Sequence, residues 1–472
     1  MNNSPLFHLF LAFSKEEKVA CRKFLHSPYH NQREDVRQLY DYLQEQYTKS
    51  SVALTKERAF AHLFPTDDFA DKKMRYTMSF LLKCMEAFLI HREREAEKVA
   101  NQLLLTRAYR RLNLPKAQAK VLKNAKKILD AQPLLDIEQY ENHYQLASAH
   151  YDAQAGQTRN APLNLQEWSQ ALDLAFLAKK LKQSCFALAH QAVYRVEYDT
   201  GLLSAVLDFL ENFSDLEKHP AIALYYYFYQ AQTTAQHEFY FKKLKTGVVE
   251  QSDLLPLEEK RNLYLAAINY CIQRFNKGEE QFLREVFDLY QAGIEQQILF
   301  EKGKLSRFTY KNVVGIALRL QEFQWAEDFI LNYQDALEKQ FKENYTHYNL
   351  SKLRFYQKNY TEAMQRLQQV EYDDLFLNLD AKVMLLKIYY ELGELDVLES
   401  FITSFQRFLQ RKKLIGYHQE NYGNMIRLTR KMLELNPFDK QEKRKLKQEI
   451  ESIKALSERD WLLKQLTDRK KF

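Results

Sequence analysis

Apolar residues recur every three or four positions along most of this chain, and the strict alternation typical of strands is almost absent. Between residues 71 and 91, for example, Met74, Met78, Leu81 and Met85 fall on one face of a helix. Such spacing indicates amphipathic helices that bury one side against a core. The pattern therefore predicts an all-α protein.

Start and stop signals divide the first hundred residues into four helices. Ser14 and Glu17 form the S-x-x-E pattern of a capping box, which predicts a helix that runs to Leu25. The helix ends before Pro28, because a residue that precedes proline is displaced from helical backbone angles. The next three helices are expected at residues 31–47, 55–64 and 71–91.

From about Val99 the pattern becomes a succession of helix pairs joined by short polar corners. Glycine, proline, asparagine and aspartate mark these corners, since they favour turn conformations. The corners are expected at residues 113–115, 132–133, 156–162, 199–201, 214–220, 246–256, 276–278 and 436–437. Two of them, taken as 153–165 and 246–256, are long enough to form flexible loops.

An internal repeat is clearest between residues 310 and 410. Residues 353–363 align with residues 388–398, and residues 316–326 form a fainter earlier copy. The matched features are an aromatic near the end of the first helix, a turn residue, a large residue that opens the second helix and a small residue within it. In order, these are Phe355 and Tyr390, Asn359 and Gly393, Tyr360 and Leu395, and Ala363.

This repeat resembles the tetratricopeptide repeat (TPR), a helix hairpin of about 34 residues. The array is degenerate, because Leu398 replaces the small residue in the last copy and the tryptophan and terminal proline positions are unfilled. The resemblance implies a right-handed superhelix, or α-solenoid, of antiparallel helix hairpins. Residues 13–29 also resemble the openings of uncharacterised bacterial helical proteins, a likeness that implies no function.

Three regions are expected on this basis. Residues 1–97 form an N-terminal helical subdomain, residues 98–437 form the TPR-like solenoid, and residues 438–472 form basic capping helices. Leu446, Ile450 and Ile453 make an apolar stripe in the last region, which suits a helix that covers the end of a repeat array.

The composition supports helices and removes most catalytic motifs. Only 10 glycines and 9 prolines occur in 472 residues, which argues against folds built on frequent tight turns. The glycines form no phosphate-binding pattern such as G-x-G-x-x-G or G-x-x-x-x-G-K-[ST], and no G-x-S-x-G nucleophile elbow.

Metal-binding patterns are equally weak. No histidine has a glutamate three residues before it, which excludes the E-x-x-H pairs of di-iron bundles. Cys21, His26 and His30 lie close in sequence, but Pro28 breaks the helix between the two histidines. We therefore expect a corner without metal, no cofactor, no small-molecule substrate and no enzymatic activity.

No secretion or membrane signal is evident. Residues 1–14 lack the basic start and the small-residue cleavage site of a signal peptide. The four cysteines lie far apart and form no C-x-x-C motif, which favours reduced, buried thiols. The expected location is the cytoplasm, with no membrane contact.

The net charge of +7 is unevenly distributed. Residues 98–132 hold nine basic residues and one acid, and residues 401–472 hold 18 basic and nine acidic residues. In the first island the lysines recur at helical spacing, so they share one helix face. The candidate contact residues are Arg107, Arg110, Arg111, Lys116, Lys120, Lys123, Lys127, Arg411, Lys412 and Lys413.

Two functions remain open. The first is a non-enzymatic protein–protein interaction scaffold that uses the concave face of the solenoid and binds a protein or peptide with an acidic segment. The alternative is a helical protein that binds RNA or DNA through the basic faces at 98–132 and 401–472. A solvated outer helix face explains the same lysines without a partner. The aromatic run Tyr225–Tyr229 is expected to pack between helices.

Overall fold

The protein is all-α. The computed structural model describes residues 1, 3–48, 55–132, 136–155, 162–194, 196–250, 254–370, 374–411, 417–436, 438–456 and 458–468. About 80% of the chain is helical, as the spacing of apolar residues predicted. Among the described helices, none is both long enough and apolar enough to cross a membrane.

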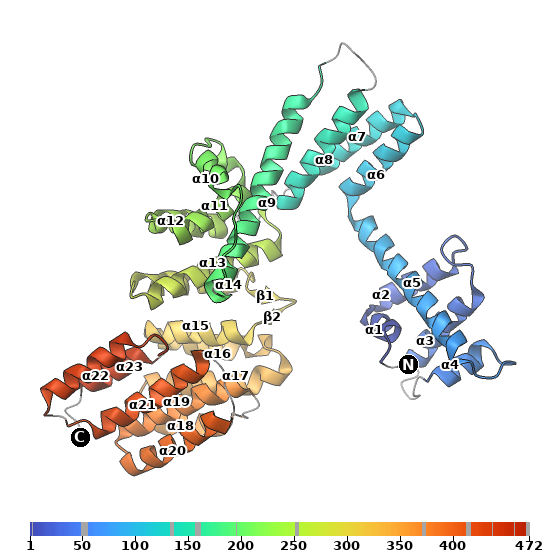
Figure 1. The fold of residues 1–472 in the computed structure, drawn as a ribbon. Coiled ribbons are helices and arrows are strands. Elements are labelled where there is room, and N and C mark those ends of the chain that lie inside the picture. Colours follow the sequence, from blue (N-terminus) through green and yellow to red (C-terminus); the bar gives the residue numbers. More distant parts are fainter. Residues whose placement is uncertain are drawn as a thin grey trace. The chain divides into compact units, whose positions relative to one another are not determined.

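The chain forms two compact units, Met1–Ala223 and Leu224–Phe472. Helices of the first unit are α1 (Pro5–Ala12), α2 (Lys15–His26), α3 (Glu34–Thr48), α4 (Lys56–Leu63), α5 (Asp71–Ala96), α6 (Lys98–Arg111), α7 (Pro115–Asp130), α8 (Ile137–Gln154), α9 (Leu165–Tyr194) and α10 (Leu203–Glu211) (Figure 1). Helix α11 (Pro220–Thr233) includes the boundary between the units. The region boundaries expected at 97/98 and 437/438 remain predictions.

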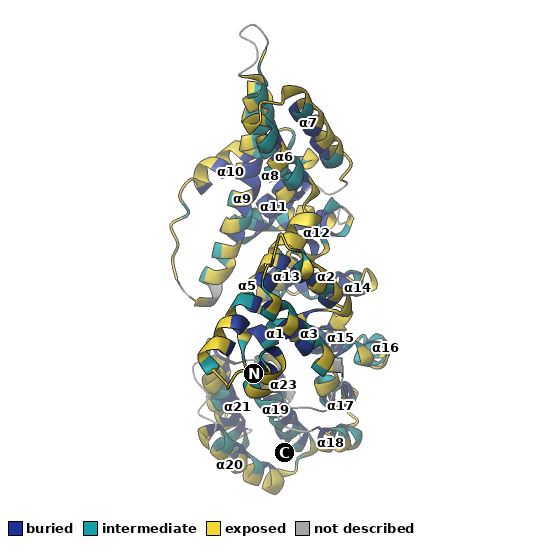
Figure 2. Cartoon of the chain, turned by 90° about the vertical axis from the view of Figure 1, so that its right-hand side faces the viewer, coloured by how far each residue is buried: buried dark blue, intermediate teal, exposed yellow. Residues whose placement is uncertain are grey.

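The second unit continues the succession of helices. Its elements are α12 (His237–Glu250), α13 (Leu257–Asn276), α14 (Gln281–Glu295), β1 (Phe300–Glu301), β2 (Lys304–Leu305), α15 (Arg307–Arg319), α16 (Phe323–Tyr333), α17 (Lys339–Tyr356), α18 (Tyr360–Gln368), α19 (Leu375–Leu392), α20 (Leu395–Arg411), α21 (Tyr417–Glu434), α22 (Lys440–Ser452) and α23 (Arg459–Asp468). Buried and exposed residues alternate along these helices, as amphipathic packing requires (Figure 2).

The first five helices share one hydrophobic core. The capping box at the start of α2 is present: Ser14 Oγ accepts from the backbone N–H of Glu17 at 3.1 Å, and Glu17 Oε2 accepts from the N–H of Ser14 at 2.7 Å. Helix α1 was not predicted, although Ser4 caps it and Pro5 occupies its first position. Its near-uniform apolar composition hides the periodicity on which the sequence analysis relied.

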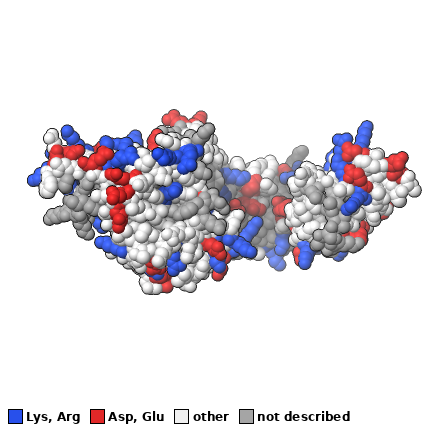
Figure 3. Space-filling model, turned by 90° about the horizontal axis from the view of Figure 1, so that it is seen from below, with Lys and Arg blue, Asp and Glu red and all other residues white. Residues whose placement is uncertain are grey.

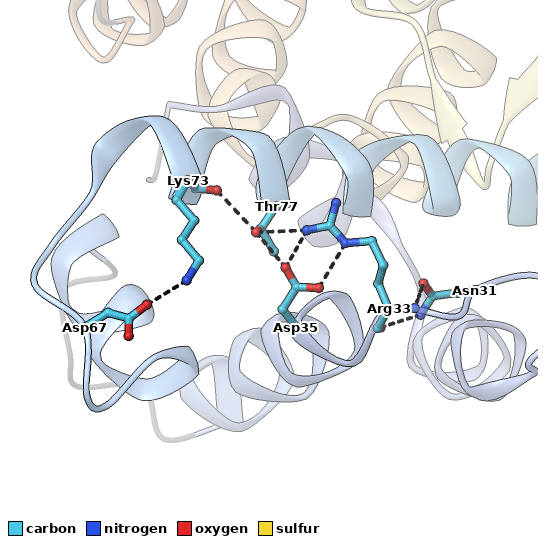
Figure 4. A network of polar contacts seen from close by, with 6 residues as sticks. All are labelled: Asn31, Arg33, Asp35, Asp67, Lys73 and Thr77. Atoms are coloured by element: carbon cyan, nitrogen blue, oxygen red, sulfur yellow. Dashed lines mark hydrogen bonds and ion pairs between the residues drawn. The ribbon is translucent and has the colours of Figure 1, made fainter.

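A polar network joins the start of α3 to α5 (Figure 4). Asp35 receives two hydrogen bonds from Arg33, at 3.0 and 2.5 Å, and a third of 2.9 Å from the hydroxyl of Thr77. Asn31 fixes the preceding loop by a 3.0 Å hydrogen bond from its side-chain amide to the carbonyl of Arg33. Lys73, one turn before Thr77, pairs with Asp67 at 2.7 Å.

The aromatic run lies on α11, whose residues 220–228 are all buried, whereas Tyr229 is half-buried. Tyr225, Tyr226, Tyr227 and Phe228 are each 7% exposed or less. The hydroxyl of Tyr225 donates to Glu259 of α13 at 2.9 Å, so a deeply buried ring still satisfies its polar group. These residues pack between helices and offer no exposed aromatic surface.

Helix pairs turn through a recurring backbone geometry. Asn113, Gly278, Gln321, Lys358 and Gly393 each follow a helix and have a positive φ, between 54° and 96°. In every case the next residue donates its N–H to a carbonyl five residues earlier, at 2.9–3.2 Å. This is the Schellman arrangement, which satisfies the last carbonyls of a helix and reverses the chain.

One local prediction was wrong, and one short element was missed. Residues 246–250 were assigned to a loop, but α12 continues through the buried Gly247 to Glu250. A short hairpin of β1 and β2 was also missed; it turns at Lys302 and Gly303, with φ angles of 50° and 74°. Two successive positive φ values define the turn that matches strand twist.

Candidate functional site

The α6–α7 hairpin carries the first basic island. After the turn at Asn113, Pro115 occupies the first position of α7, where its missing N–H costs nothing. One face of α7 is buried by Val121, Leu122, Ala125 and Leu129, the residues that the sequence pattern selected. The opposite face is therefore left to solvent.

That exposed face holds the predicted lysines. Lys116, Lys120, Lys123 and Lys127 are all exposed on α7. No hydrogen bond or ion pair joins any of the four to another described residue. Four unpaired ammonium groups within three turns of one helix repel each other, and an anion placed among them would be attracted.

A groove of about 1130 Å³ runs beside these lysines. Lys120, Lys123 and Lys127 line it, whereas Lys116 does not. Lys126 lines it as well, and the sequence analysis missed this residue because it lies outside the regular stripe. The groove is completed by Gln102 and Tyr109 of α6 and by Ala117, Val121, Asn124, Asp130 and Ala131. It thus combines an apolar surface with a cationic rim, which we call the lysine groove.

The arginines of α6 do not line the lysine groove. Arg107 and Arg110 line a second cavity of about 270 Å³, together with Glu141 and Asp152 of α8. Arg110 Nη1 pairs with Asp152 Oδ2 at 2.6 Å, and Arg111 is exposed and lines neither cavity. The arginines and the lysines of this island therefore face different surroundings, and Arg110 already has an anionic partner.

The second basic island is only partly described. Arg411 is exposed and its Nε donates to the carbonyl of Arg407 at 3.3 Å, while Lys412 and Lys413 lie outside the described residues. Leu446 and Ile450 of α22 are buried in one apolar cluster with residues of α19, α20, α21 and α23. On the face shown in Figure 3, basic and acidic side chains are interleaved rather than segregated.

One group of metal-ligand types comes together within the described residues. Single ligand atoms of His237, Glu238 and Glu279 all lie within 4.8 Å of one another. The Nδ1 of His237 is 2.8 Å from the Tyr270 hydroxyl, and its Nε2 contacts the guanidinium of Arg274, which also pairs with Glu279 at 2.9 Å. A metal ion would have to displace these contacts, so the group is explained by its own hydrogen bonds.

The Cys21, His26 and His30 side chains have separate partners. His26 Nε2 lies 3.3 Å from Asp41, and the ring of His30 stacks on Phe24 with 3.9 Å between centroids. Cys21 is fully buried, and burial raises the pKa of its thiol to about 12. The two histidines therefore have separate structural contacts, and the thiol is buried in the core.

Sequence reasoning missed a charged cluster among the helices of the second unit. Lys311 of α15 pairs with Asp380 of α19 at 2.6 Å, and the hydroxyl of Tyr422 donates to the same carboxylate at 2.8 Å. Lys387 of α19 pairs with Glu458, immediately before α23, at 2.8 Å. The ion-pair partners are some 70 residues apart, so no local pattern in the sequence predicts their contact. The only available indication of the cluster was a lysine within an apolar helix.

Lys352 of α17 lies among these charges. No hydrogen bond or ion pair links its ammonium to another described residue. Burial lowers the pKa of Lys352 to about 8, and the positive charges of Lys311 and Arg319 act in the same direction, although Glu458 and Asp380 oppose it. A partly buried ammonium without a direct partner is unusual and marks this cluster as a second candidate surface.

The comparisons with known proteins give no relative from which a function could be transferred. No family model, no curated protein and no solved structure matches this chain. The all-α fold, the lysine groove and the charged cluster of the second unit are therefore the observations on which a function must rest.

Proposed function

We propose that this protein is a non-enzymatic interaction scaffold of the cytoplasm and that its lysine groove binds an acidic segment of a partner protein. The proposal includes a TPR-like right-handed superhelix for the hairpins of residues 310–410. In this arrangement the helices present a preformed surface, so a partner binds without an ordering cost on the scaffold side.

Recurring geometry supports the solenoid part of the proposal. The positive-φ turns at Gln321, Lys358 and Gly393 fall at the spacing of the sequence repeat. Two residues with equivalent places in the repeat, Ala363 and Leu398, are fully buried. The hydroxyl of Ser351 donates to the carbonyl of Ala363 at 2.9 Å, so the first and second helices of that hairpin approach closely.

The proposal that the protein binds an acidic partner segment rests on the lysine groove. Lys120, Lys123, Lys126 and Lys127 line an opening large enough for several side chains, and its surface includes Val121. A partner with alternating carboxylates and apolar side chains would pair with the rim and bury apolar area on this surface.

Nucleic acid is the less favoured partner. Among the residues that line the lysine groove, Tyr109 is the one aromatic, whereas binding of single strands usually relies on several stacked rings. Arg107 and Arg110 line a different cavity that also holds Glu141 and Asp152, so the basic island does not form one continuous track for phosphates.

A direct binding measurement tests the proposal. The full chain is titrated with a fluorescent peptide of glutamate and leucine residues, and separately with labelled RNA and DNA oligonucleotides of equal charge, at low and moderate salt. We expect the peptide to bind, with an affinity that falls as salt rises. Replacing Lys120, Lys123 and Lys127 together by Glu should weaken binding at least about tenfold, because truncating charge pairs at interfaces has effects of that size.

A matched control separates this site from net charge. Lys15, Lys72 and Lys83 are also exposed and without ion pairs to described residues. Their combined replacement by Glu changes the net charge equally and should leave peptide affinity almost unaltered. Equal losses in both triple variants, or tighter binding of nucleic acid than of peptide through the same lysines, would contradict the proposal.

A further inference from the structure

Three helices of the second unit, α15, α17 and α19, each supply a cation whose charge acts on one carboxylate. Lys387 of α19 forms a 2.8 Å ion pair with Glu458, and only 9% of its side chain is exposed. Burial alone would raise the pKa of Glu458, but Lys387, Lys352 of α17 and Arg319 of α15 together hold that pKa below its usual value. The field at Glu458 is therefore set by three positive groups from three helices.

An aromatic contact accompanies the ion pair. The ammonium of Lys387 lies 4.8 Å from the ring centroid of Phe355 and 5.6 Å from that of Trp461. Trp461 is one helical turn after Glu458, and its indole N–H donates to Glu391 of α19 at 2.7 Å. Lys387 pairs with the glutamate of a Glu-x-x-Trp pattern and lies near the tryptophan ring. Glu391 accepts the hydrogen bond of the indole, so both residues of the pattern are recognised.

Apolar residues complete the contact. Leu462 and Leu466 of α23 are buried with Tyr390, Leu386 and other residues of α19–α22. The edge of the Trp461 ring meets Tyr390 with 5.3 Å between centroids. Helix α23 is only ten residues long, so its position depends on these contacts rather than on its own helical stability.

In this charged cluster, the basic side chains outnumber the carboxylates that are free to pair with them. Asp380 is already held by Lys311 and Tyr422, which leaves Glu458 to face Arg319, Lys352 and Lys387. The ammonium of Lys352 lies against α15, where a Cβ on Gly315 would come within 3.1 Å of it. Arg319 and Lys352 have no ion pair with a described residue and could accept a further anionic group.

We infer that Arg319, Lys352, Lys387 and the ring of Phe355 form a binding surface for a short helical segment of a partner protein, one that carries a carboxylate and a large aromatic residue three positions later. In the structure, residues 458–466 of the chain itself occupy this surface. The C-terminal helix is thus an internal competitor that the partner segment displaces.

The competition follows from tethering. A segment joined to its own binding surface acts at an effective concentration near the millimolar range, so a free peptide of the same chemistry binds weakly until the internal segment is loosened. A partner with a second carboxylate has an advantage, because it can also pair with Lys352 and Arg319. This inference concerns residues other than the lysine groove and does not depend on that groove.

Peptide binding to the full chain tests the inference. The probe is a fluorescent synthetic peptide with the sequence of residues 454–468, and anisotropy gives its affinity. Replacing Glu458 by Gln and Trp461 by Phe loosens the internal segment and should tighten peptide binding at least about tenfold. Adding Lys387→Gln to that variant should abolish the gain, and a probe whose own Glu and Trp are replaced by Gln and Ala should not bind.

Two outcomes of this experiment would overturn the inference. A double variant that keeps native circular dichroism yet binds the probe no better than wild type excludes the surface. A dimer of that variant in light scattering assigns the surface to a second copy of the chain instead. The Lys120, Lys123 and Lys127 triple variant should bind the probe like wild type, so failure of the lysine groove leaves this result intact.

Hydrogen exchange covers the case in which the double variant does not fold. Glu458→Gln alone preserves the shape of the side chain and removes only its charge. We expect faster amide exchange in α23 with unchanged exchange in α17 and α19. Unchanged exchange in α23 would show that the charged contact does not hold the segment in place and would overturn the inference.

Discussion

Lys358 and Gly393 occupy the same backbone position in two consecutive helix hairpins, with φ angles of 61° and 75°. Each ends the first helix of its pair and donates its N–H to the carbonyl three residues earlier, at 2.9 and 3.2 Å. Glycine adopts this left-handed conformation at no steric cost, whereas a side chain with a Cβ costs about 1–2 kcal/mol there. The turn is therefore set by the surrounding helices and not by its residue type.

This relationship predicts opposite effects of two substitutions. Lys358→Gly should stabilise the protein by about 1 kcal/mol, because it removes the steric cost of the left-handed residue, and Gly393→Ala should destabilise it by about the same amount. Urea denaturation of each variant measures the change. Lys358→Ala serves as the control and should have little effect, since alanine keeps the Cβ that causes the strain.

Asp35 should make the stability of the folded protein depend on pH in the acidic range. Burial would raise its pKa, but the hydrogen bonds from Arg33 and Thr77 together lower it. The folded state therefore binds a proton less readily than the unfolded state, and the stabilisation is present above a pH of about 4 and is lost as pH falls through the lowered pKa. Asp35→Asn should cost about 1–3 kcal/mol at neutral pH. Denaturation at pH 7 should show this loss, and the difference from wild type should shrink in acid.

Unlike the carboxylate of Asp35, the charged form of Lys352 should destabilise the protein, and this cost should decrease at alkaline pH. Its pKa of about 8 lies below the ordinary value of 10.5, so the folded state loses the proton first as pH rises. The cost of burying the ammonium is constant below pH 8 and decreases between the two values. Lys352→Met should therefore stabilise the protein at neutral pH, and this gain should shrink as pH approaches 10.5. Lys339→Met, at the exposed start of α17, should show no such pH dependence in urea denaturation.

The four thiols should react only after opening of the fold. Cys21, Cys84, Cys185 and Cys271 are all buried, and burial raises the pKa of each thiol. We expect a thiol-specific chromogenic disulfide to label native protein at least about a hundredfold more slowly than unfolded protein. Cys84 should react first, since at 7% it is the most exposed of the four. Fast labelling of Cys185 in native protein would contradict this prediction.

Local signals in the sequence predicted most of the helices. The capping box of Ser14 and Glu17 is present, and the apolar stripe of α7 is buried as its spacing required. These features depend on residues three or four positions apart, which the sequence displays directly. Helix α1 and the helical stretch through Gly247 were missed, because uniform apolarity and a glycine both obscure helical periodicity.

The surroundings of the candidate residues could not be predicted in the same way. The spacing of Lys120, Lys123 and Lys127 placed them on one helix face, but only the neighbouring helix α6 decides which lysines line a groove. Arg110 was grouped with them, yet its partner Asp152 lies 42 positions later. Lys387 and Glu458 are 71 residues apart, so their pairing depends on tertiary packing alone.

The complete burial of residues 220–228 of α11 also affects how the chain folds during synthesis. Tyr225 emerges from the ribosome 34 residues before Glu259, the residue that accepts its hydrogen bond. At usual elongation rates, this interval lasts on the order of seconds, during which α13 is not yet available to cover the Tyr225 ring. The aromatic segment of α11 is therefore expected to be prone to aggregation, and to bind chaperones, in the nascent chain until α13 is made.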